Sequence, residues 1–266
     1  MKTKAIWTKT ILCMALLCGW FTSAQAVDHV KGDGKLTAKQ ITVADFNAIK
    51  VDGVMDFYYE QSDAPAKVEV TVDQNLHPYV NIEVNDRTLT VNFKGAKVDH
   101  FTKFIVRANS KWLAEAKLSG NANLVVNGPL TGDETTIKAN ANCLVQLKGL
   151  VTVGKLDLNI AGSANMVVNN LKADKIECDI DGSGSVTLKD GSVKEGEYSA
   201  VGSGDIHAFG LSVSQLTCKM AGSGLMEVNA PDKLKANLIG KGKIRYKGPT
   251  TIEERIIGKG SIEEVK

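Results

Sequence analysis

The chain has 266 residues, with 32 basic and 30 acidic side chains that give a formal net charge of +2. Charges of both signs are interspersed and no basic run occurs, which excludes the electrostatic pattern of a typical nucleic-acid-binding protein. Beyond the first 26 residues no apolar stretch reaches the roughly 20 residues that a membrane-spanning helix needs. The remaining 240 residues are enough for a large buried core.

Residues 1–26 have the three parts of a secretory signal peptide. A start with three lysines precedes a short apolar core at 11–17, and Ala24-Gln25-Ala26 is a small-x-small cleavage site. We therefore predict that the chain is exported and that Val27 is the first mature residue. Cleavage would remove three lysines and no acids, so the formal net charge would fall from +2 to −1.

A lipoprotein signal is a second interpretation of the same segment. In Leu16-Leu17-Cys18-Gly19 the cysteine would carry the lipid and anchor the protein to a membrane. The residue before such a cysteine is normally small and Leu17 is not, so cleavage after Ala26 is favoured. The three other cysteines of the mature chain form no CxxC pair, and their odd number indicates buried thiols rather than a disulfide framework. They are Cys143, Cys178 and Cys218.

A short glycine-containing phrase recurs along the second half of the chain. It reads Ala161-Gly162-Ser163-Ala164 and then Asp181-Gly182-Ser183-Gly184, and from Gly162 the leading glycines are spaced by 20, 20, 20, 18 and 18 residues. A fixed period of this length predicts a solenoid in which each repeat is one coil. The phrases are led by Gly120, Gly162, Gly182, Gly202, Gly222, Gly240 and Gly258.

Apolar and polar residues alternate on both sides of each phrase. This period of two predicts strands with one buried face, and the glycines mark tight corners because they tolerate positive φ and close backbone approach. Aligning the coils predicts one continuous apolar column, formed by Leu124, Met166, Val186, Ile206, Met226, Ile244 and Ile262. The neighbouring column ends in alternating charge and predicts an exposed ladder of Glu227, Arg245 and Glu263.

The N-terminal part is less repetitive and still has the pattern of β structure. The predicted organisation is a signal peptide at 1–26, a flexible lead at 27–40, an irregular β region at 41–111 and solenoid repeats at 112–266, continuous with that region. One helical turn is predicted at 73–78, and Asp52-Gly53-Val54-Met55 resembles a first corner. The strands predicted in this part are Ile41–Val51, Met55–Glu60, Lys67–Val72, Val80–Val84, Thr88–Phe93 and Lys103–Ala108.

The order of these features resembles the head GIN domain family, described as putative auto-transporter adhesins. The resemblance covers roughly residues 42–240. It implies a right-handed parallel β-helix in an exported protein of a Gram-negative bacterium, placed in the periplasm or on the outer surface, and supplies no catalytic or ligand residues. An auto-transporter needs a C-terminal membrane barrel, whereas here the repeat runs to Lys266. The resemblance is carried by Phe46-Asn47-Ala48-Ile49-Lys50-Val51, Val54-Met55-Asp56-Phe57, Val68-Glu69-Val70, Asp73-Gln74-Asn75-Leu76, Leu89-Thr90-Val91 and the serial Gly-Ser-Gly phrases.

No set of side chains has the spacing of a reactive site. The four histidines are scattered, and a Gly-Ser-Gly phrase without a following helix is not a nucleophile elbow. Acids near the corners do not follow the nonapeptide period of calcium-binding solenoids. We predict no catalytic, cofactor-binding or metal-binding residue and leave ligand-binding residues unassigned. The residues weighed are His29, His77, His100, His207, Ser163, Ser183, Ser203, Ser223, Asp52, Asp56, Asp181 and Asp205.

Three lysines make a small basic strip near the C-terminus. Lys241 and Lys259 replace the serine of the phrase in adjacent coils, and Lys243 lies nearby. The strip suits an anionic glycan or lipid headgroup, but a solvated edge that deters sheet-to-sheet association is the favoured interpretation.

The predicted function is that of a non-enzymatic cell-envelope protein, which presents a β-helical surface to a glycan, an envelope protein or its own copies. The alternative is a polysaccharide-active β-helix enzyme with its site in the N-terminal β region, where aromatic side chains are most frequent and would suit sugar rings or a core. Those aromatic residues are Phe57, Tyr58, Tyr59, Tyr79, Phe93, Phe101 and Trp112.

Overall fold

The computed structural model describes residues 29–248 and 251–265, so the predicted signal peptide and Cys18 lie outside the described residues. The N-terminal part of the described chain contains nine strands and one short 3-10 helix. This helix confirms the helical turn predicted at 73–78. The elements are β1 (His29–Lys31), β2 (Leu36–Thr42), β3 (Ala48–Gly53), β4 (Asp56–Gln61), β5 (Lys67–Asp73), η1 (Gln74–Tyr79), β6 (Val80–Asn85), β7 (Thr88–Phe93), β8 (Lys97–His100) and β9 (Ile105–Ser110).

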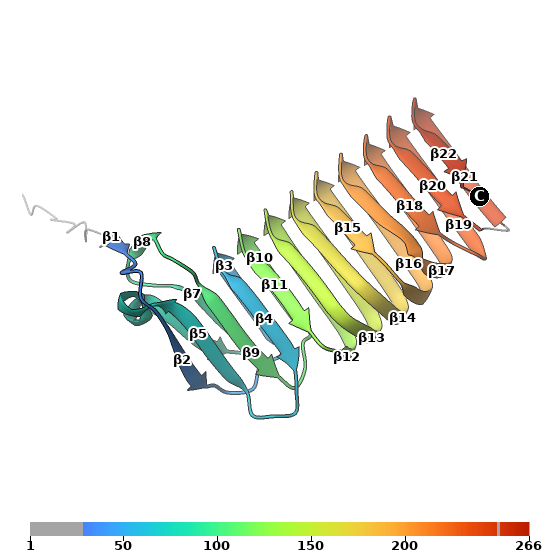
Figure 1. The fold of residues 1–266 in the computed structure, drawn as a ribbon. Coiled ribbons are helices and arrows are strands. Elements are labelled where there is room, and N and C mark those ends of the chain that lie inside the picture. The colour runs from blue at the N-terminus through green and yellow to red at the C-terminus, as the bar shows by residue number, and fades with distance from the viewer. Residues whose placement is uncertain (1–28, 249–250, 266) are drawn as a thin grey trace, which may run out of the picture.

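The rest of the chain winds into a parallel β-solenoid that extends away from the N-terminal part (Figure 1). The predicted all-β solenoid with coils of about 20 residues is therefore confirmed. Its strands are β10 (Glu115–Gly120), β11 (Asn123–Asn127), β12 (Leu130–Ala141), β13 (Leu144–Gly162), β14 (Asn165–Gly182), β15 (Ser185–Leu188), β16 (Gly191–Gly202), β17 (Asp205–Gly222), β18 (Leu225–Asn229), β19 (Lys233–Gly240), β20 (Lys243–Lys247), β21 (Thr251–Gly258) and β22 (Ser261–Glu264).

The strands of successive coils pair in the register that the repeat predicts. Val186 pairs with Ile206, and Ile206 pairs with Met226, and all three side chains are fully buried. Val145 from the imperfect copy completes the apolar column between Leu124 and Met166. Because a single coil cannot bury its inner face, this stacking supplies both the core and the backbone hydrogen bonds.

The corner glycines are required by stacking as well as by backbone conformation. Gly202 has φ of +109°, and a Cβ built there would lie 2.5 Å from the carbonyl oxygen of Gly182 in the preceding coil. No side chain tolerates both conditions without a local shift. Serine residues follow several of these glycines, and the hydroxyl oxygens of Ser163 and Ser183 on successive coils lie 3.1 Å apart.

The repeat begins earlier than the boundary predicted at residue 112. Strands β3 and β4 pair in parallel with β10 and β11, and Gly53 lies in register with Gly120. The phrase at 52–55 is therefore the first corner of the solenoid. A further rung is formed by β7 and β9, and the antiparallel strands β6, β5 and β2 continue the sheets beyond it. We call residues 62–111 together with β2 the N-terminal cap.

The flexible lead predicted at 27–40 is wrong for the described part of that segment. Residues 29–31 form β1, which pairs with β8, and residues 36–42 form β2, which pairs with β5 along its whole length. The strand predicted over Ile41–Val51 is correspondingly broken, because β2 ends at Thr42 and β3 starts at Ala48. Its two halves have different partners, which local composition does not reveal.

Candidate ligand-binding face

One outer face of the solenoid carries polar and charged side chains in straight rows. It is formed by β3, β10, β12, β16, β19, β21 and the corner-proximal halves of β13, β14 and β17. Because side chains alternate across a strand, positions three and one before each corner glycine point outward together. We call this the ladder face. Its central row is Lys50, Lys117, Lys138, Asn159, Asp179, Ser199, Lys219, Asn237 and Arg255.

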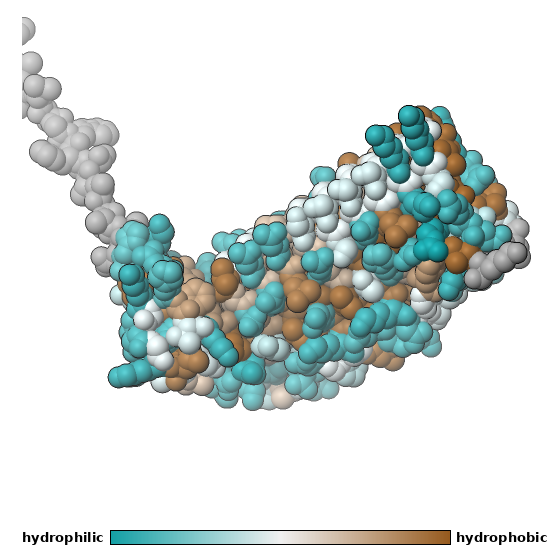
Figure 2. Space-filling model, turned by 45° about the horizontal axis from the view of Figure 1, so that its top comes forward, coloured by the Kyte–Doolittle hydropathy of each residue, from teal (hydrophilic) through white to brown (hydrophobic). Residues whose placement is uncertain are grey.

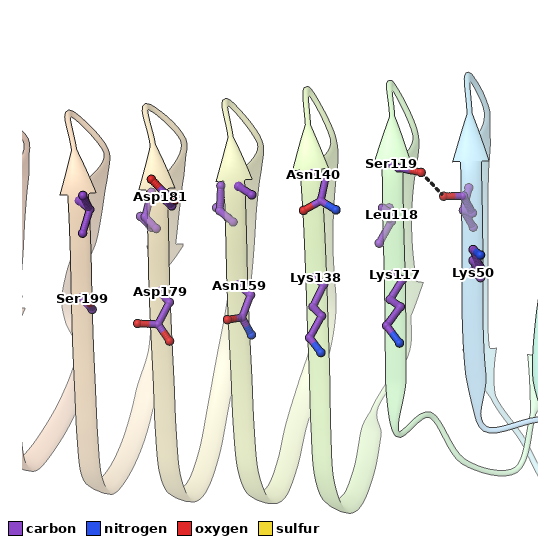
Figure 3. A pocket seen from close by; sticks show the side chains of 15 residues that line it. Lys50, Lys117, Leu118, Ser119, Lys138, Asn140, Asn159, Asp179, Asp181 and Ser199 are labelled. Atoms are coloured by element: carbon purple, nitrogen blue, oxygen red, sulfur yellow. Dashed lines mark hydrogen bonds between the residues drawn. The ribbon is translucent and has the colours of Figure 1, made fainter.

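A second row runs beside the corners, two residues further along each strand. This corner row is Asp52, Ser119, Asn140, Ala161, Asp181, Val201, Ala221, Ile239 and Ile257. An open groove of about 590 Å³ lies over the two rows on six neighbouring strands, from β3 to β16. Figure 3 shows the labelled lysine, asparagine, aspartate and serine side chains lined up along it.

The N-terminal end of the groove is basic, with its lysines held in place. The Glu115 carboxylate accepts hydrogen bonds from the Nζ atoms of Lys117, at 2.7 Å, and Lys138, at 3.2 Å. Burial alone would raise the pKa of Glu115, but the hydrogen bonds from the two lysines outweigh it and lower the pKa. Ser119 donates to the Asp52 carboxylate at 2.6 Å. The side chains are thus positioned before any ligand arrives.

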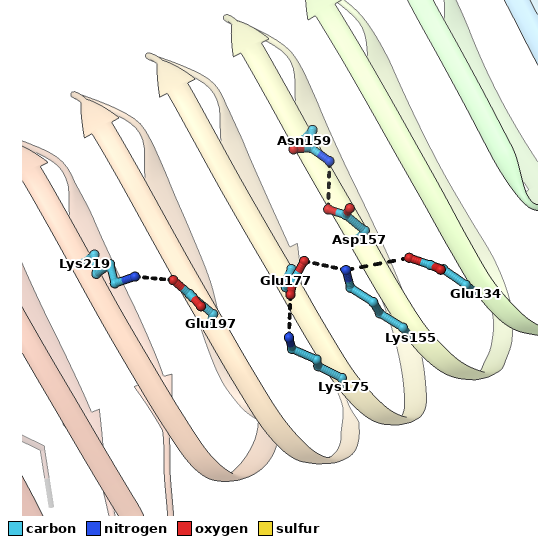
Figure 4. Close-up of polar contacts among 8 residues, drawn as sticks. All are labelled: Glu134, Lys155, Asp157, Asn159, Lys175, Glu177, Glu197 and Lys219. Carbon is cyan, nitrogen blue, oxygen red and sulfur yellow. Dashed lines mark hydrogen bonds and ion pairs between the residues drawn. The ribbon is translucent and has the colours of Figure 1, made fainter.

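The middle of the ladder face is acidic, because the register places carboxylates on successive coils. Asp157 pairs with Glu177, and Glu177 pairs with Glu197. Like charges opposite one another are unfavourable, and here lysines compensate for them (Figure 4). Lys155 and Lys175 each approach Glu177 at 2.6 Å, and their hydrogen bonds lower the pKa of Glu177.

The pKa of Asp179, on the same face, is shifted in the opposite direction. Burial raises its pKa, and the nearby charges of Asp157, Glu197 and Glu177 raise it further. It is bracketed in the central row by Asn159 and Ser199, which are neutral hydrogen-bonding residues. This stretch therefore combines donors and acceptors at the spacing of parallel strands, about 4.8 Å.

The aromatic side chains of the N-terminal region are divided between the core, the cap and the surface. Phe57 and Tyr59 are fully buried, and the Tyr59 hydroxyl donates to the Ser110 backbone oxygen at 3.2 Å. Phe93 packs in the cap against Phe101 and Phe104. Tyr58 and Trp112 lie beneath the cations of Arg107 and Lys111, on separate segments of the chain. Tyr58 lines a surface pocket with Glu60 and Glu69, and Trp112 lines a separate one with Asp133 and Glu134.

The expected surface ladder of charges is formed in part. Arg245 contacts Glu227 at 2.8 Å, whereas Glu263 is paired with Lys243 at 3.2 Å. His207 of the neighbouring coil lies 2.9 Å from Glu227 through Nδ1. One of the three lysines of the predicted basic strip, Lys243, is thereby engaged in an ion pair.

The acids weighed for calcium are dispersed and have other partners. Asp56 accepts from Asn123 at 2.7 Å, and Asp205 accepts from the Leu225 backbone N–H at 2.8 Å. Across residues 29–248 and 251–265, no three His, Cys, Asp or Glu side chains gather as metal ligands. No helix in the described chain is long and apolar enough to cross a membrane.

Comparison with known proteins places this fold in a family. The model of the putative auto-transporter adhesin, head GIN domain family matches residues 45–249. The chain belongs to this family. Among curated proteins no relative matches it.

Solved structures of similar proteins cover 90% of this chain and 100% of their own. A putative adhesin from Parabacteroides distasonis shares 76% identity with a TM-score of 0.89. A second putative adhesin, from Parabacteroides merdae, shares 62% identity with a TM-score of 0.89. A putative lipid binding protein from Parabacteroides distasonis shares 33% identity with a TM-score of 0.85. These likenesses support an adhesin-like role for this head GIN domain.

The three cysteines of the described chain are buried and unpaired, as predicted. Burial raises the pKa of the Cys178 and Cys218 thiols, so both are held in the unreactive protonated form. They flank Tyr198 in one core column of this head GIN domain. The thiols therefore serve packing, and the chemistry available to a ligand lies on the outer faces.

Sequence reasoning missed the ladder face, although the signal is present in the repeat. The predicted columns consist of residues after each glycine phrase, whereas the ladder face consists of residues before it. Reading three places back from each glycine gives the central row directly. What the repeat does not give is the groove, because the depth of a surface depends on sheet twist and on the packing of neighbouring side chains.

Proposed function

We propose that this chain is a non-catalytic, adhesin-like domain of the cell envelope and that its ladder face binds an extended glycan. The observation that carries the proposal is the central row itself. Lys117, Lys138, Asn159 and Asp179 stand on four successive coils in register, along one groove. A polymer with repeated hydroxyl groups would meet a donor or acceptor at each strand spacing.

The electrostatics of the face favour binding over hydrolysis. A glycosidase needs a proton-donating and a proton-accepting carboxyl group flanking the bond within a cleft. Here Glu115 and Glu177 are each held by two lysines, and their lowered pKa values keep them ionised. The described connections between coils are short, as between β15 and β16, where two residues join Leu188 to Gly191. These features support a rigid recognition surface.

Export belongs to the same proposal. The signal-like segment 1–26 would direct the chain out of the cytoplasm, and the mature domain would then act in the periplasm or at the outer surface of a Gram-negative bacterium. N-terminal sequencing of the protein recovered from fractionated cells tests this step. A start at Val27 is expected, whereas a lipid-modified Cys18 would show the anchored form.

The ligand is tested with purified residues 27–266 on a glycan array, followed by calorimetry on any glycan that binds. Asp179→Asn and Lys138→Gln alter two groove positions and are expected to weaken binding at least fivefold. Gln146→Ala changes an outward residue on the opposite sheet and serves as the matched control. An array without signal, or equal losses in the groove variants and the control, would overturn the proposal.

A further inference from the structure

The corner row changes character at the C-terminal end of the ladder face. After the polar Asn140 and Asp181 it becomes apolar on four successive coils, and the apolar residues are in register. Three of them are far more exposed than is usual for such side chains: Val201 at 52%, Ile239 at 53% and Ile257 at 47%. The fourth is Ala221. We call these four residues the apolar strip, and brown side chains are visible near this end of the molecule in Figure 2.

The strip borders a groove of its own, with a volume of about 380 Å³. The central row forms the other side of this groove and contributes Ser199, Lys219, Asn237 and Arg255. Arg255 and Ile257 are two residues apart on β21, so both side chains leave the same face of one strand. Asn237 and Ile239 have the same relation on β19. A polar edge thus runs parallel to the apolar one.

The two cations of this groove are not equivalent. Lys219 is in contact with Glu197 in the adjacent coil and is largely neutralised. The Arg255 guanidinium forms no ion pair with any described residue, and Glu253 on the same strand is paired with Lys233 at 2.9 Å. An exposed guanidinium with free donors is suited to bidentate binding of a carboxylate. The charge that complements this groove is therefore negative, and it belongs at the β21 end.

The size of the strip decides the class of ligand. A stable protein interface buries about 800 Å² on each partner, which four side chains in a row do not provide. The groove volume instead lies in the range of small-molecule sites, about 300–1,000 Å³. We propose that the groove binds a free medium-chain fatty acid. Its carboxylate would lie on Arg255 beside the Asn237 amide, and its chain would cross the strands along Ile257, Ile239, Ala221 and Val201.

This geometry limits the length of the chain that gains affinity. The four coils span three strand spacings, about 14 Å, which matches an extended chain of roughly ten to twelve carbons. A methylene fully removed from water contributes about fourfold in affinity, and an open groove covers about half of it. We therefore expect affinity to rise about twofold per carbon up to this length and then to level off.

The experiment is calorimetric titration of residues 27–266 with sodium octanoate, decanoate and dodecanoate below their micelle concentrations. Decyl glucoside supplies the same chain without the charge, and butyrate supplies the charge without the chain. Decanoate is expected to bind at least tenfold more tightly than either. Arg255→Gln should abolish the preference over decyl glucoside, and Ile239→Asn should weaken both ligands at least tenfold.

Two matched variants control for general surface effects. Lys172→Gln removes an exposed cation from the part of β14 that lies outside the ladder face, and Val54→Asn removes an apolar side chain that is 53% exposed outside the strip. Both should bind decanoate as the parent protein does, and unchanged melting temperatures verify folding. Absence of saturable decanoate binding overturns the inference, as do equal losses in the test and control variants.

A third arm separates a free fatty acid from a membrane surface. Vesicles of phosphatidylglycerol are sedimented with the parent protein and with Arg255→Gln. The proposal is wrong if the parent protein sediments with the vesicles, the Arg255→Gln variant does not, and free decanoate does not bind. That result would show that the groove contacts a membrane surface. A negative glycan array leaves the inference intact, because the two grooves share only Ser199 and Val201.

Discussion

The two ends of the solenoid are finished by different means. At the N-terminal end the rung of β7 and β9 is followed by antiparallel strands, and aromatic side chains at 93–104 fill the cap. In the last described coil β21 and β22 each pair with one described strand, and the inner side of this coil, which we call the open end, is partly exposed. Ile256 is 43% exposed, whereas Leu238 at the same position of the preceding coil is fully buried.

The open end is protected by charge. Two inward-facing columns of the core finish in glutamates, because Glu254 follows Ala236 and Glu264 follows Tyr246 in register. Inward-pointing charges are one way in which natural sheets prevent the addition of another strand. Both glutamates lie near Tyr246, where burial raises the pKa of the phenol and the two carboxylates raise it further. At the N-terminal end packed side chains cover the core. At the C-terminal end a further strand would bury a carboxylate, which is energetically unfavourable.

The largest effect is expected where coils stack on one another. Gly202 and Gly53 both have φ of +109°, but only Gly202 has a neighbour that a Cβ would strike. Gly53→Ala should cost about 1–2 kcal/mol from backbone conformation alone. Gly202→Ala should cost about 2–5 kcal/mol, since it adds overpacking against the preceding coil. Urea denaturation measures both, and equal losses would show that stacking does not select these glycines.

The cap should be the next most sensitive region. The buried carboxylate of Asp73 accepts from the Thr102 backbone N–H at 2.7 Å and from its hydroxyl at 2.8 Å. Asp73→Ala should lower the free energy of unfolding by about 2 kcal/mol through these lost hydrogen bonds. Asp99→Ala removes a more exposed acid of the same cap, and its effect on the free energy of unfolding should be much smaller. Thermal unfolding monitored by circular dichroism distinguishes the two, and similar shifts would contradict this account.

The open end offers a test by association rather than by stability. The double variant Glu254→Ala with Glu264→Val restores the residue types found earlier in these two core columns. We expect it to pair end to end, with light scattering giving a mass near that of a dimer at concentrations where the parent is monomeric. The control, Glu253→Ala with Glu263→Val, changes the outward neighbours on the same strands. Should the control associate equally, surface charge in general and not inward placement would be the cause.

The smallest effect contrasts two aspartates with opposite pKa shifts. Burial raises the pKa of Asp179, so its protonated form is favoured in the folded state and stability is lost as pH rises through that pKa. Asp179→Asn should therefore stabilise the protein at pH 7 by less than about 1 kcal/mol, and the gain should vanish below about pH 3.9.

Asp73 should behave in the reverse way. Burial alone would raise its pKa, but the hydrogen bonds from Thr102 lower it overall. Its contribution is present above the unfolded pKa and is lost as pH falls through the folded one. Asp73→Asn should thus cost stability at pH 7 and progressively less in acid. Unfolding curves between pH 3 and 7 for both asparagine variants test the pair, and parallel pH profiles would refute the contrast.

Prediction from the sequence succeeded where the relevant contacts repeat. The coil length, the glycine corners and the stacking of Val186 on Ile206 follow from a period that is visible in the chain. It failed where partners are distant. The lead at 27–40 contains strands because β2 pairs with β5, and the first coil lies before residue 112 because β3 pairs with β10. His207 gains Glu227 as a partner only when two coils are superimposed.

The sequence by itself determined that this chain is a stack of short β coils with glycine corners, because alternation and a fixed period are local properties that each coil repeats. Only the tertiary structure decided which end is closed, which carboxylates share lysines and where the two grooves lie. Those outcomes depend on side chains that come within a few ångströms of one another from coils about twenty residues apart, and their depth and charge arise from neighbours that no single repeat contains.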